Sequence, residues 1–190
     1  MHKQRIWMVI VVLVLAGLAC QLPTIGAVST GGDNLEPIVV SDEAADNLRD
    51  KWREIVTSPD RGFTLVVTEQ ELTSLVVQQL EASGGTTELQ NLSLYLRDGA
   101  VIMRAQYAAE GLSAPLEARI DISVNGGALR FAISEARLGP LAVPADLLAQ
   151  FQQQLDSAGG GLTEINGQVV TFESVTISEG EMTVSGAFAP

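Results

Sequence analysis

Apolar and polar residues alternate strictly along much of the chain between residues 92 and 133. The alternating segments are separated by turn sequences, of which Asp98-Gly99 is typical of a hairpin and Asn125-Gly126-Gly127 is a second turn. Because successive side chains of a strand point to opposite faces, this alternation predicts antiparallel strands with one buried face and one wet face. A last hairpin is predicted around Glu179-Gly180. Its apolar positions are Val175, Ile177, Met182, Val184 and Phe188.

Three segments have apolar residues at the three- and four-residue spacing that predicts amphipathic helices. The first covers residues 41–56, with Ser41 as its N-cap. The second opens with Thr68-Glu69-Gln70-Glu71, which has the form of a capping box. The third begins near Pro144, a residue that suits the first turn of a helix.

The second and third helices, and the hairpins after them, resemble each other. Gln78-Gln79-Leu80-Glu81 and Gln153-Gln154-Leu155-Asp156 are 75 positions apart, as are Gly84-Gly85 and Gly159-Gly160. Agreement in order, spacing and turn type favours an internal duplication over chance similarity between two helices. We therefore predict the α+β class. It would contain one continuous twisted antiparallel sheet of about six or seven strands, with two amphipathic helices across its apolar face.

The N-terminus has the form of an export signal. A short basic stretch precedes an apolar run from Ile6 to Ala19, and Cys20, the only cysteine, follows directly. The run has 14 residues, whereas a membrane-spanning helix needs about 20, which favours a signal peptide. Leu15-Ala16-Gly17-Leu18-Ala19-Cys20 is similar to the lipobox of bacterial lipoproteins, although a glycine stands third before the cysteine, where leucine is usual.

Three outcomes are open at this end of the chain. Removal of residues 1–19 and palmitate-type acylation of Cys20 would give a lipoprotein, the favoured interpretation. Ordinary cleavage would give a soluble exported domain, and no cleavage a single N-terminal transmembrane anchor. Two of these outcomes place the protein at the extracytoplasmic face of the cell membrane. We then predict a flexible tether at residues 20–40, the helix at 41–56 and an α+β domain at 57–190.

Charge and composition restrict the function. Without residues 1–19 the chain has 9 basic and 23 acidic residues, a net charge of −14. Phosphate backbones and anionic head groups repel such a chain, so we expect no nucleic-acid binding, and membrane attachment must be covalent or helical. The mature chain has no histidine, which excludes a Ser-His-Asp triad and histidine-based zinc sites. We expect no enzyme activity, no metal and no cofactor, and we interpret the strand carboxylates as a solvated sheet face.

The apolar face of the sheet is the candidate binding site. Small residues such as Ala105, Ala118, Ala132 and Gly186 lie among larger apolar ones. They can make room for an acyl chain or let a helix pack closely, so a lipid-accessible groove and an ordinary packed core both fit. If the groove forms, we expect it to be lined by Leu75, Val76, Met103, Ile122, Phe131, Leu148, Phe151 and Met182.

Four motifs within residues 63–188 carry a resemblance to a known family. They are Thr68-Glu69-Gln70-Glu71-Leu72, Leu94-x-Leu96-x-Asp98-Gly99-x-Val101-x-Met103, Leu138-Gly139-Pro140-Leu141-x-Val143-Pro144 and Val175-x-Ile177-x-x-Gly180-x-Met182-x-Val184-x-Gly186. In order and turn type they resemble small cell-envelope proteins of the LmeA and YpmS type. The resemblance implies a membrane-anchored, phospholipid-binding module of the cell envelope, and it offers no catalytic residue to transfer.

These observations predict a membrane-tethered extracytoplasmic lipoprotein whose domain binds a lipid or other apolar ligand without covalent chemistry. The alternative is an envelope scaffold with a solid core, which binds a protein partner through its acidic sheet face. A cavity of about 300 Å³ or more between helices and sheet would favour lipid binding, and a dry core with an exposed apolar patch elsewhere would favour the scaffold.

Overall fold

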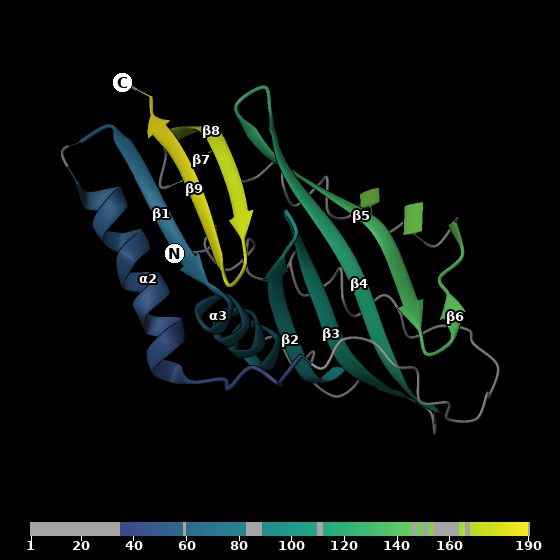
Figure 1. Cartoon of the computed structure of the whole chain (residues 1–190). Helices are drawn as coiled ribbons and strands as arrows, with labels where there is room; N and C mark the ends of the chain where they lie inside the picture. Colours follow the sequence, from purple (N-terminus) through teal and green to yellow (C-terminus); the bar gives the residue numbers. More distant parts are fainter. Residues whose placement is uncertain are drawn as a thin grey trace.

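The computed structural model describes residues 35–58, 60–82, 89–109, 112–145, 148–149, 152–153, 164–165 and 168–189. The predicted signal peptide, Cys20, Phe151 and most of the predicted third helix lie outside these ranges. The elements follow in this order (Figure 1): α2 (Asp42–Thr57), β1 (Gly62–Thr68), α3 (Glu69–Ala82), β2 (Leu89–Arg97), β3 (Ala100–Ala109), β4 (Leu112–Asn125), β5 (Ala128–Leu138), β6 (Leu141–Ala142), β7 (Glu164–Ile165), β8 (Gln168–Ser178) and β9 (Glu181–Phe188). None of the helices in the described ranges is long and apolar enough to cross a membrane.

The strands form two antiparallel sheets, ordered β2-β3-β4-β5-β6 and β1-β9-β8-β7. The α+β class is confirmed, but the prediction of one continuous sheet is wrong. β1 pairs along its whole length with β9, from Gly62 opposite Ala187 to Thr68 opposite Glu181. The β8–β9 hairpin therefore pairs with β1 and does not extend the sheet formed by β2 to β6. Alternation determines which face of a strand is buried, but it does not determine which strand edge it joins.

The predicted turns of the first and last hairpins are confirmed, and apolar residues lie opposite each other across them. Leu94 lies opposite Met103 in the first hairpin, and Ile177 lies opposite Met182 in the last. Asp98 and Gly99 both have positive φ, 49° and 76°, as a type I′ hairpin turn requires. The apolar residues of each strand therefore share one face.

Backbone hydrogen bonds join the two sheets at two turns. The β8–β9 turn contacts β2 of the larger sheet and α3. Gly180 N donates to Leu96 O at 3.0 Å, and Glu69 N donates to Gly180 O at 3.2 Å. The β4–β5 turn contacts β8, because Phe172 N donates to Gly127 O at 2.8 Å. These bonds connect the end of the chain to its middle and fix one sheet against the other.

Local capping chemistry determines where both labelled helices begin. Ser41 Oγ accepts from Ala44 N at 3.2 Å at the start of α2. At α3 the predicted capping box forms: Glu71 N donates to Thr68 Oγ1 at 3.3 Å, and Thr68 N donates to a Glu71 carboxylate oxygen at 3.0 Å. Both predicted N-termini are confirmed to within one residue. α2 packs against α3 and β1 (Figure 1).

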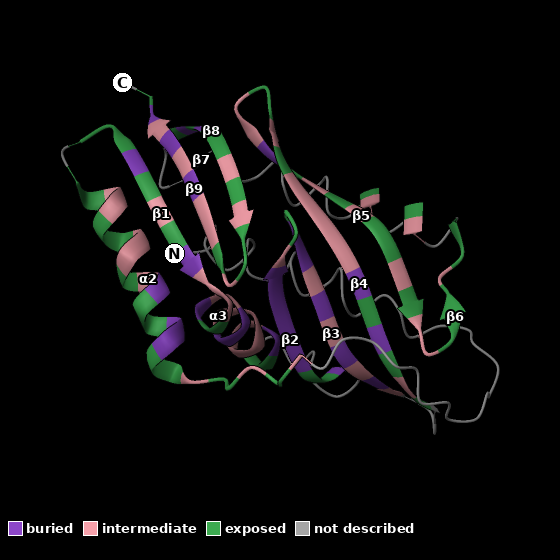
Figure 2. Ribbon diagram, viewed as in Figure 1, coloured by how far each residue is buried: buried purple, intermediate pink, exposed green. Residues whose placement is uncertain are grey.

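Buried side chains form two clusters, which we call the first and second cores (Figure 2). The first core lies between α3 and strands β2, β3 and β4, with Leu96 fully buried. The second core joins the smaller sheet to α2 and to the β4–β5 hairpin, and it is rich in aromatic rings. Phe63 contacts Trp52, Phe172 and Phe188, with ring centroids 5.5 to 6.1 Å apart.

Helix side chains satisfy backbone groups on β2 and on the part of β5 that β6 does not pair with. On β2, Leu94 N donates to Thr73 Oγ1 at 3.0 Å, and Leu96 N donates to Glu69 Oε1 at 2.6 Å. On β5, the Gln152 side chain accepts from Ile133 N at 3.0 Å and donates to Phe131 O at 2.6 Å. Unpaired strand edges are templates for unwanted pairing, and these side chains occupy part of both edges.

Residues 35–40, predicted as the end of a flexible tether, contact the larger sheet and α3. The Tyr95 hydroxyl donates to Glu36 O at 3.0 Å, and Gln70 Nε2 donates to Val39 O at 3.1 Å. Tyr95 occupies a position that the alternation predicts as wet, yet it is only 4% exposed. The segment before α2 therefore belongs to the folded domain, and the chain enters the domain across β2.

Candidate functional site

Three of the eight predicted groove residues, Ile122, Phe131 and Met182, lie where the two cores meet. Ile122 on β4 and Met182 on β9 pack against both cores. Ile177 on β8 packs against the first core and Phe131 on β5 against the second. We call these four residues the sheet junction. Two of them, Ile122 and Met182, bring segments 60 positions apart in sequence into one apolar region.

The remaining predicted residues occupy several positions around this region. Met103 is buried in the first core, and Val76 packs against the same core from α3. Leu75, also on α3, is half-buried and stands outside both cores as the described residues define them. Leu148 is half-buried and helical, and Phe151 lies outside the described ranges.

The sheet junction is incompletely closed. All four of its residues are half-buried, whereas neighbouring core residues such as Leu96 and Val170 are at most 1% exposed. The apolar interior therefore reaches the surface between the sheets. An acyl chain that contacted these four residues would bury their remaining exposed surface.

The small residues have different roles from one another. Ala105 and Ala118 are buried in the first core, and Ala132 is exposed. At Gly186 the free space is already filled, because an added Cβ would lie 2.6 Å from Thr171 O and 2.8 Å from Phe63 Cζ. This glycine serves close packing of the Phe63 ring and offers no room for a ligand.

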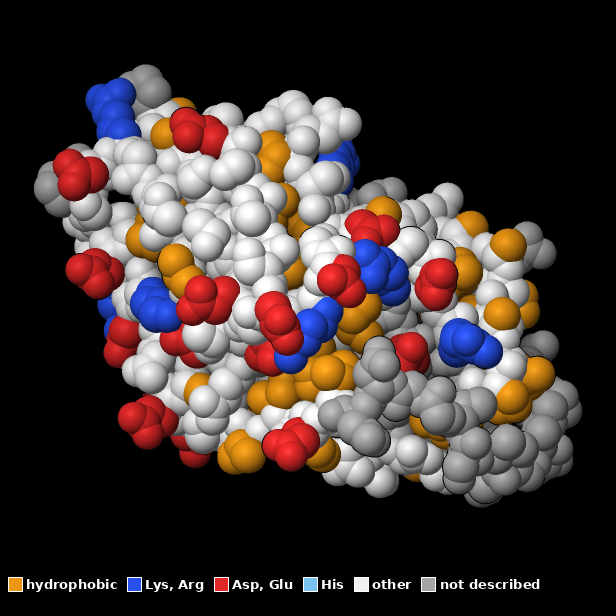
Figure 3. Space-filling view, viewed as in Figure 1, with side chains coloured by type: hydrophobic (Ala, Val, Ile, Leu, Met, Phe, Trp, Pro, Cys, Tyr) orange, Lys and Arg blue, Asp and Glu red, His pale blue; other side chains and the backbone are white. Residues whose placement is uncertain are grey.

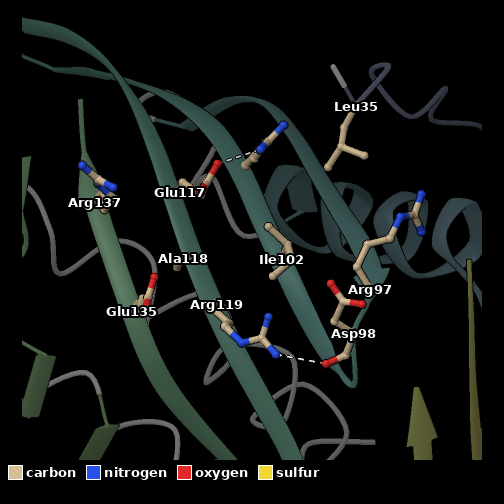
Figure 4. Close-up of a pocket in the computed structure, with 10 residues that line it drawn as sticks. Leu35, Arg97, Asp98, Ile102, Glu117, Ala118, Arg119, Glu135 and Arg137 are labelled. Carbon is tan, nitrogen blue, oxygen red and sulfur yellow. Dashed lines mark hydrogen bonds and ion pairs between the residues drawn. The ribbon is translucent and has the colours of Figure 1, made fainter. Parts of the chain in front are cut away.

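A concave feature lies on the polar face of the larger sheet, opposite the first core. It is a cavity of about 440 Å³, which we call the outer groove (Figure 4). Its lining residues are Leu35, Arg97, Asp98, Ile102, Arg104, Glu117, Ala118, Arg119, Glu135 and Arg137. In Figure 4, Ile102 lies between Glu135 and Arg137 on one side and Arg97 and Asp98 on the other. Figure 3 shows this face of the molecule, where acidic, basic and apolar side chains lie close together.

Several charges of the outer groove are engaged in local pairs. Arg97 forms an ion pair with Glu69. Arg104 Nε lies 2.7 Å from Glu117 Oε2, and the Arg104 guanidinium carbon is 5.9 Å from the Tyr95 ring centroid. These contacts hold Arg97 and Arg104, two of the four arginines of the outer groove, in place.

Arg119 is engaged at a second point of the groove. It donates through Nη2 to Asp98 O at 3.0 Å, and its Nε is 3.4 Å from Asp121 Oδ1.

The face that the sequence predicts as acidic therefore has mixed charge. Sequence reasoning missed these arginines because they stand singly among acidic residues. The sequence does contain a signal for this mixed charge: four of the chain's 11 basic residues occupy polar positions on the strands β2 to β5.

The described residues hold no cluster of three or more His, Cys, Asp or Glu side chains that could bind a metal ion. In the same ranges, every buried side-chain nitrogen or oxygen has a hydrogen-bond partner.

Comparisons of the chain with protein-family models, with curated proteins and with solved structures found no match in any of the three. The residues and their geometry therefore carry the functional argument.

Proposed function

We propose that this protein is a membrane-tethered extracytoplasmic lipoprotein whose domain binds a lipid or other apolar chain without covalent chemistry. The observation that carries the proposal is the sheet junction, where half-buried Ile122 and Met182 pack against both cores. An acyl chain inserted between the sheets would bury this surface, at about 25 cal/mol for each Å² of apolar area. The internal duplication and acylation of Cys20 belong to the same proposal.

The route of the N-terminal segment supports this arrangement. Residues 35–40 contact the folded domain, and Cys20 lies 15 positions before Leu35. A flexible linker of this length has a typical end-to-end distance of about 20 Å. The domain would therefore stay close to the membrane surface, where an apolar ligand can be exchanged.

The experiment is native mass spectrometry of the full chain purified in an uncharged detergent, followed by organic extraction of co-purified lipid. We expect extra mass on part of the population, which extraction removes. Ile122→Trp fills the sheet junction and should reduce bound lipid about fivefold or more, while Val169→Trp should leave it unchanged. Val169 is the control because it is apolar, is 52% exposed and lies on β8 of the smaller sheet.

A further variant guards against a folding artefact. Ile122→Ala removes bulk without adding any, so it should retain or increase uptake of a fluorescent fatty acid. Lipid binding at the junction is contradicted if purified chain carries no lipid and takes up no fluorescent fatty acid. It is also contradicted if Ile122→Trp and Val169→Trp behave alike.

A further inference from the structure

We propose that the outer groove is a second binding site, which takes a small zwitterion carrying one anionic group and one ammonium group. Arg137 would hold the anionic group, and Glu135 would hold the ammonium group. This site lies on the sheet face opposite the first core, so it does not depend on an apolar ligand at the sheet junction.

Strand register in the larger sheet places opposite charges face to face without pairing them. In β4 and β5, Glu117 lies directly opposite Arg137, and Arg119 lies opposite Glu135. Cross-strand charge pairs of this kind ordinarily stabilise a sheet. Here Glu117 binds Arg104 instead, and Arg119 turns toward Asp98 O and Asp121.

Glu135 and Arg137 are consequently left without an ion pair or side-chain hydrogen bond to other described residues. A guanidinium presents five donors in a planar fork, and a carboxylate presents about four acceptor positions. These two side chains lie two residues apart on β5 and both line the groove. The donors of Arg137 and the acceptors of Glu135 are therefore open to a ligand, because the ion pairs Arg104–Glu117 and Arg119–Asp121 do not engage them.

The mixed charges of the outer groove restrict the charge that a ligand can carry. A bare anion in the groove would face the carboxylates of Asp98, Glu117 and Glu135, and the whole chain has a net charge of −12. A bare cation would face four arginines. Like charges brought together cost free energy, so a ligand with one charge of each sign fits best. Ile102 and Leu35 offer apolar contact for the carbon atoms between the two charges.

The test is isothermal titration calorimetry on the full chain in an uncharged detergent. The zwitterionic probe is glycerophosphoethanolamine, in which two carbons separate the phosphate from the ammonium group. Glycerol phosphate and ethanolamine are the probes that carry charge of one sign only. We expect the zwitterion to bind about tenfold more tightly than either, because both charges contribute charge-assisted hydrogen bonds.

The variants locate the site. Arg137→Gln and Glu135→Gln should each weaken zwitterion binding about tenfold. Arg130→Gln should change it less than about twofold, since Arg130 is exposed on the same strand but does not line the groove. Circular dichroism of each variant checks that the fold is retained.

Two sources of the zwitterion are distinguished by competition. If phosphatidylethanolamine dissolved in the same detergent displaces the probe, the source is a lipid head group, and if glycine or another free amino acid displaces it, the source is a soluble zwitterion. Either result supports the site. The proposal is overturned if the probe shows no saturable binding, if glycerol phosphate binds as tightly, or if Arg130→Gln weakens binding as much as Arg137→Gln.

Discussion

Lys51 on α2 and Glu71 in the first turn of α3 form an ion pair, with 2.7 Å between Nζ and Oε1. Glu71 is only 7% exposed. Its carboxylate also accepts from Thr68 N, while Lys51 Nζ donates to Val66 O at 3.0 Å. One carboxylate thus closes the capping box and attaches α2 to the β1–α3 connection.

Glu71 makes the stability of the fold depend on pH. Burial alone raises the pKa of Glu71, but the hydrogen bonds from Lys51 and Thr68 and the charge of Lys51 outweigh it and lower the pKa below its ordinary value of 4.5. A lowered folded-state pKa gives stability that is present above about pH 4.5 and is lost as pH falls through the folded-state pKa. We expect Glu71→Gln to cost about 1–2 kcal/mol of unfolding free energy at neutral pH, with the difference from the parent shrinking below about pH 4.

Urea unfolding followed by circular dichroism at several pH values measures this effect. Glu81→Gln is the control, because Glu81 is exposed on the same helix. A constant difference between Glu71→Gln and the parent down to low pH would contradict the explanation.

Thr73 stabilises the edge of β2. Its side chain is fully buried, and its hydroxyl accepts from Leu94 N at 3.0 Å. Thr73→Val keeps the volume but leaves this amide without a partner, which should cost about 1–3 kcal/mol. Thermal and urea unfolding measure the loss. Thr64→Val, on the exposed face of β1, should change stability by less than about 0.5 kcal/mol, and an equal effect of the two would rule out the edge bond as the cause.

Gly186 is required by the packing of Phe63. A Cβ at this position would meet both the Phe63 ring and Thr171 O at under 3 Å. Gly186→Ala should therefore destabilise the domain by about 1–3 kcal/mol through overpacking. Gly62→Ala is a matched control on the paired strand, because a Cβ at Gly62 meets nothing within 4 Å. Differential scanning calorimetry compares the two, and a similar melting temperature for both would show that the second core can rearrange.

Tyr95 attaches the entering chain to the sheet. Tyr95→Phe removes the hydroxyl that donates to Glu36 O but retains the buried ring. We expect faster hydrogen exchange and faster proteolysis at residues 35–40, because their local opening free energy falls by about 1 kcal/mol. Exchange in β3 should be unchanged. If the 35–40 segment exchanges at the same rate in both proteins, the other contacts are sufficient to hold it.

Local sequence determined the elements and their internal registers. The capping box of α3, the N-cap Ser41, the Asp98-Gly99 turn and the alternation through β2 to β5 each depend on residues close together in the chain. Such features follow from backbone geometry and neighbouring side chains, so they can be read without knowing the fold. Three of the four sheet-junction residues, Ile122, Phe131 and Met182, were predicted for the same reason.

Only the tertiary structure decided how these elements associate. The pairing of β1 with β9 divides the strands into two sheets, creates the sheet junction around Ile122 and Met182, and leaves the outer groove on the other face. The burial of Tyr95 and the lack of an ion pair between Arg119 and Glu135 likewise depend on segments distant in sequence. Alternation specifies a face but not a partner, because every antiparallel edge offers the same backbone hydrogen bonds. The choice among edges is made by side-chain packing across the whole domain.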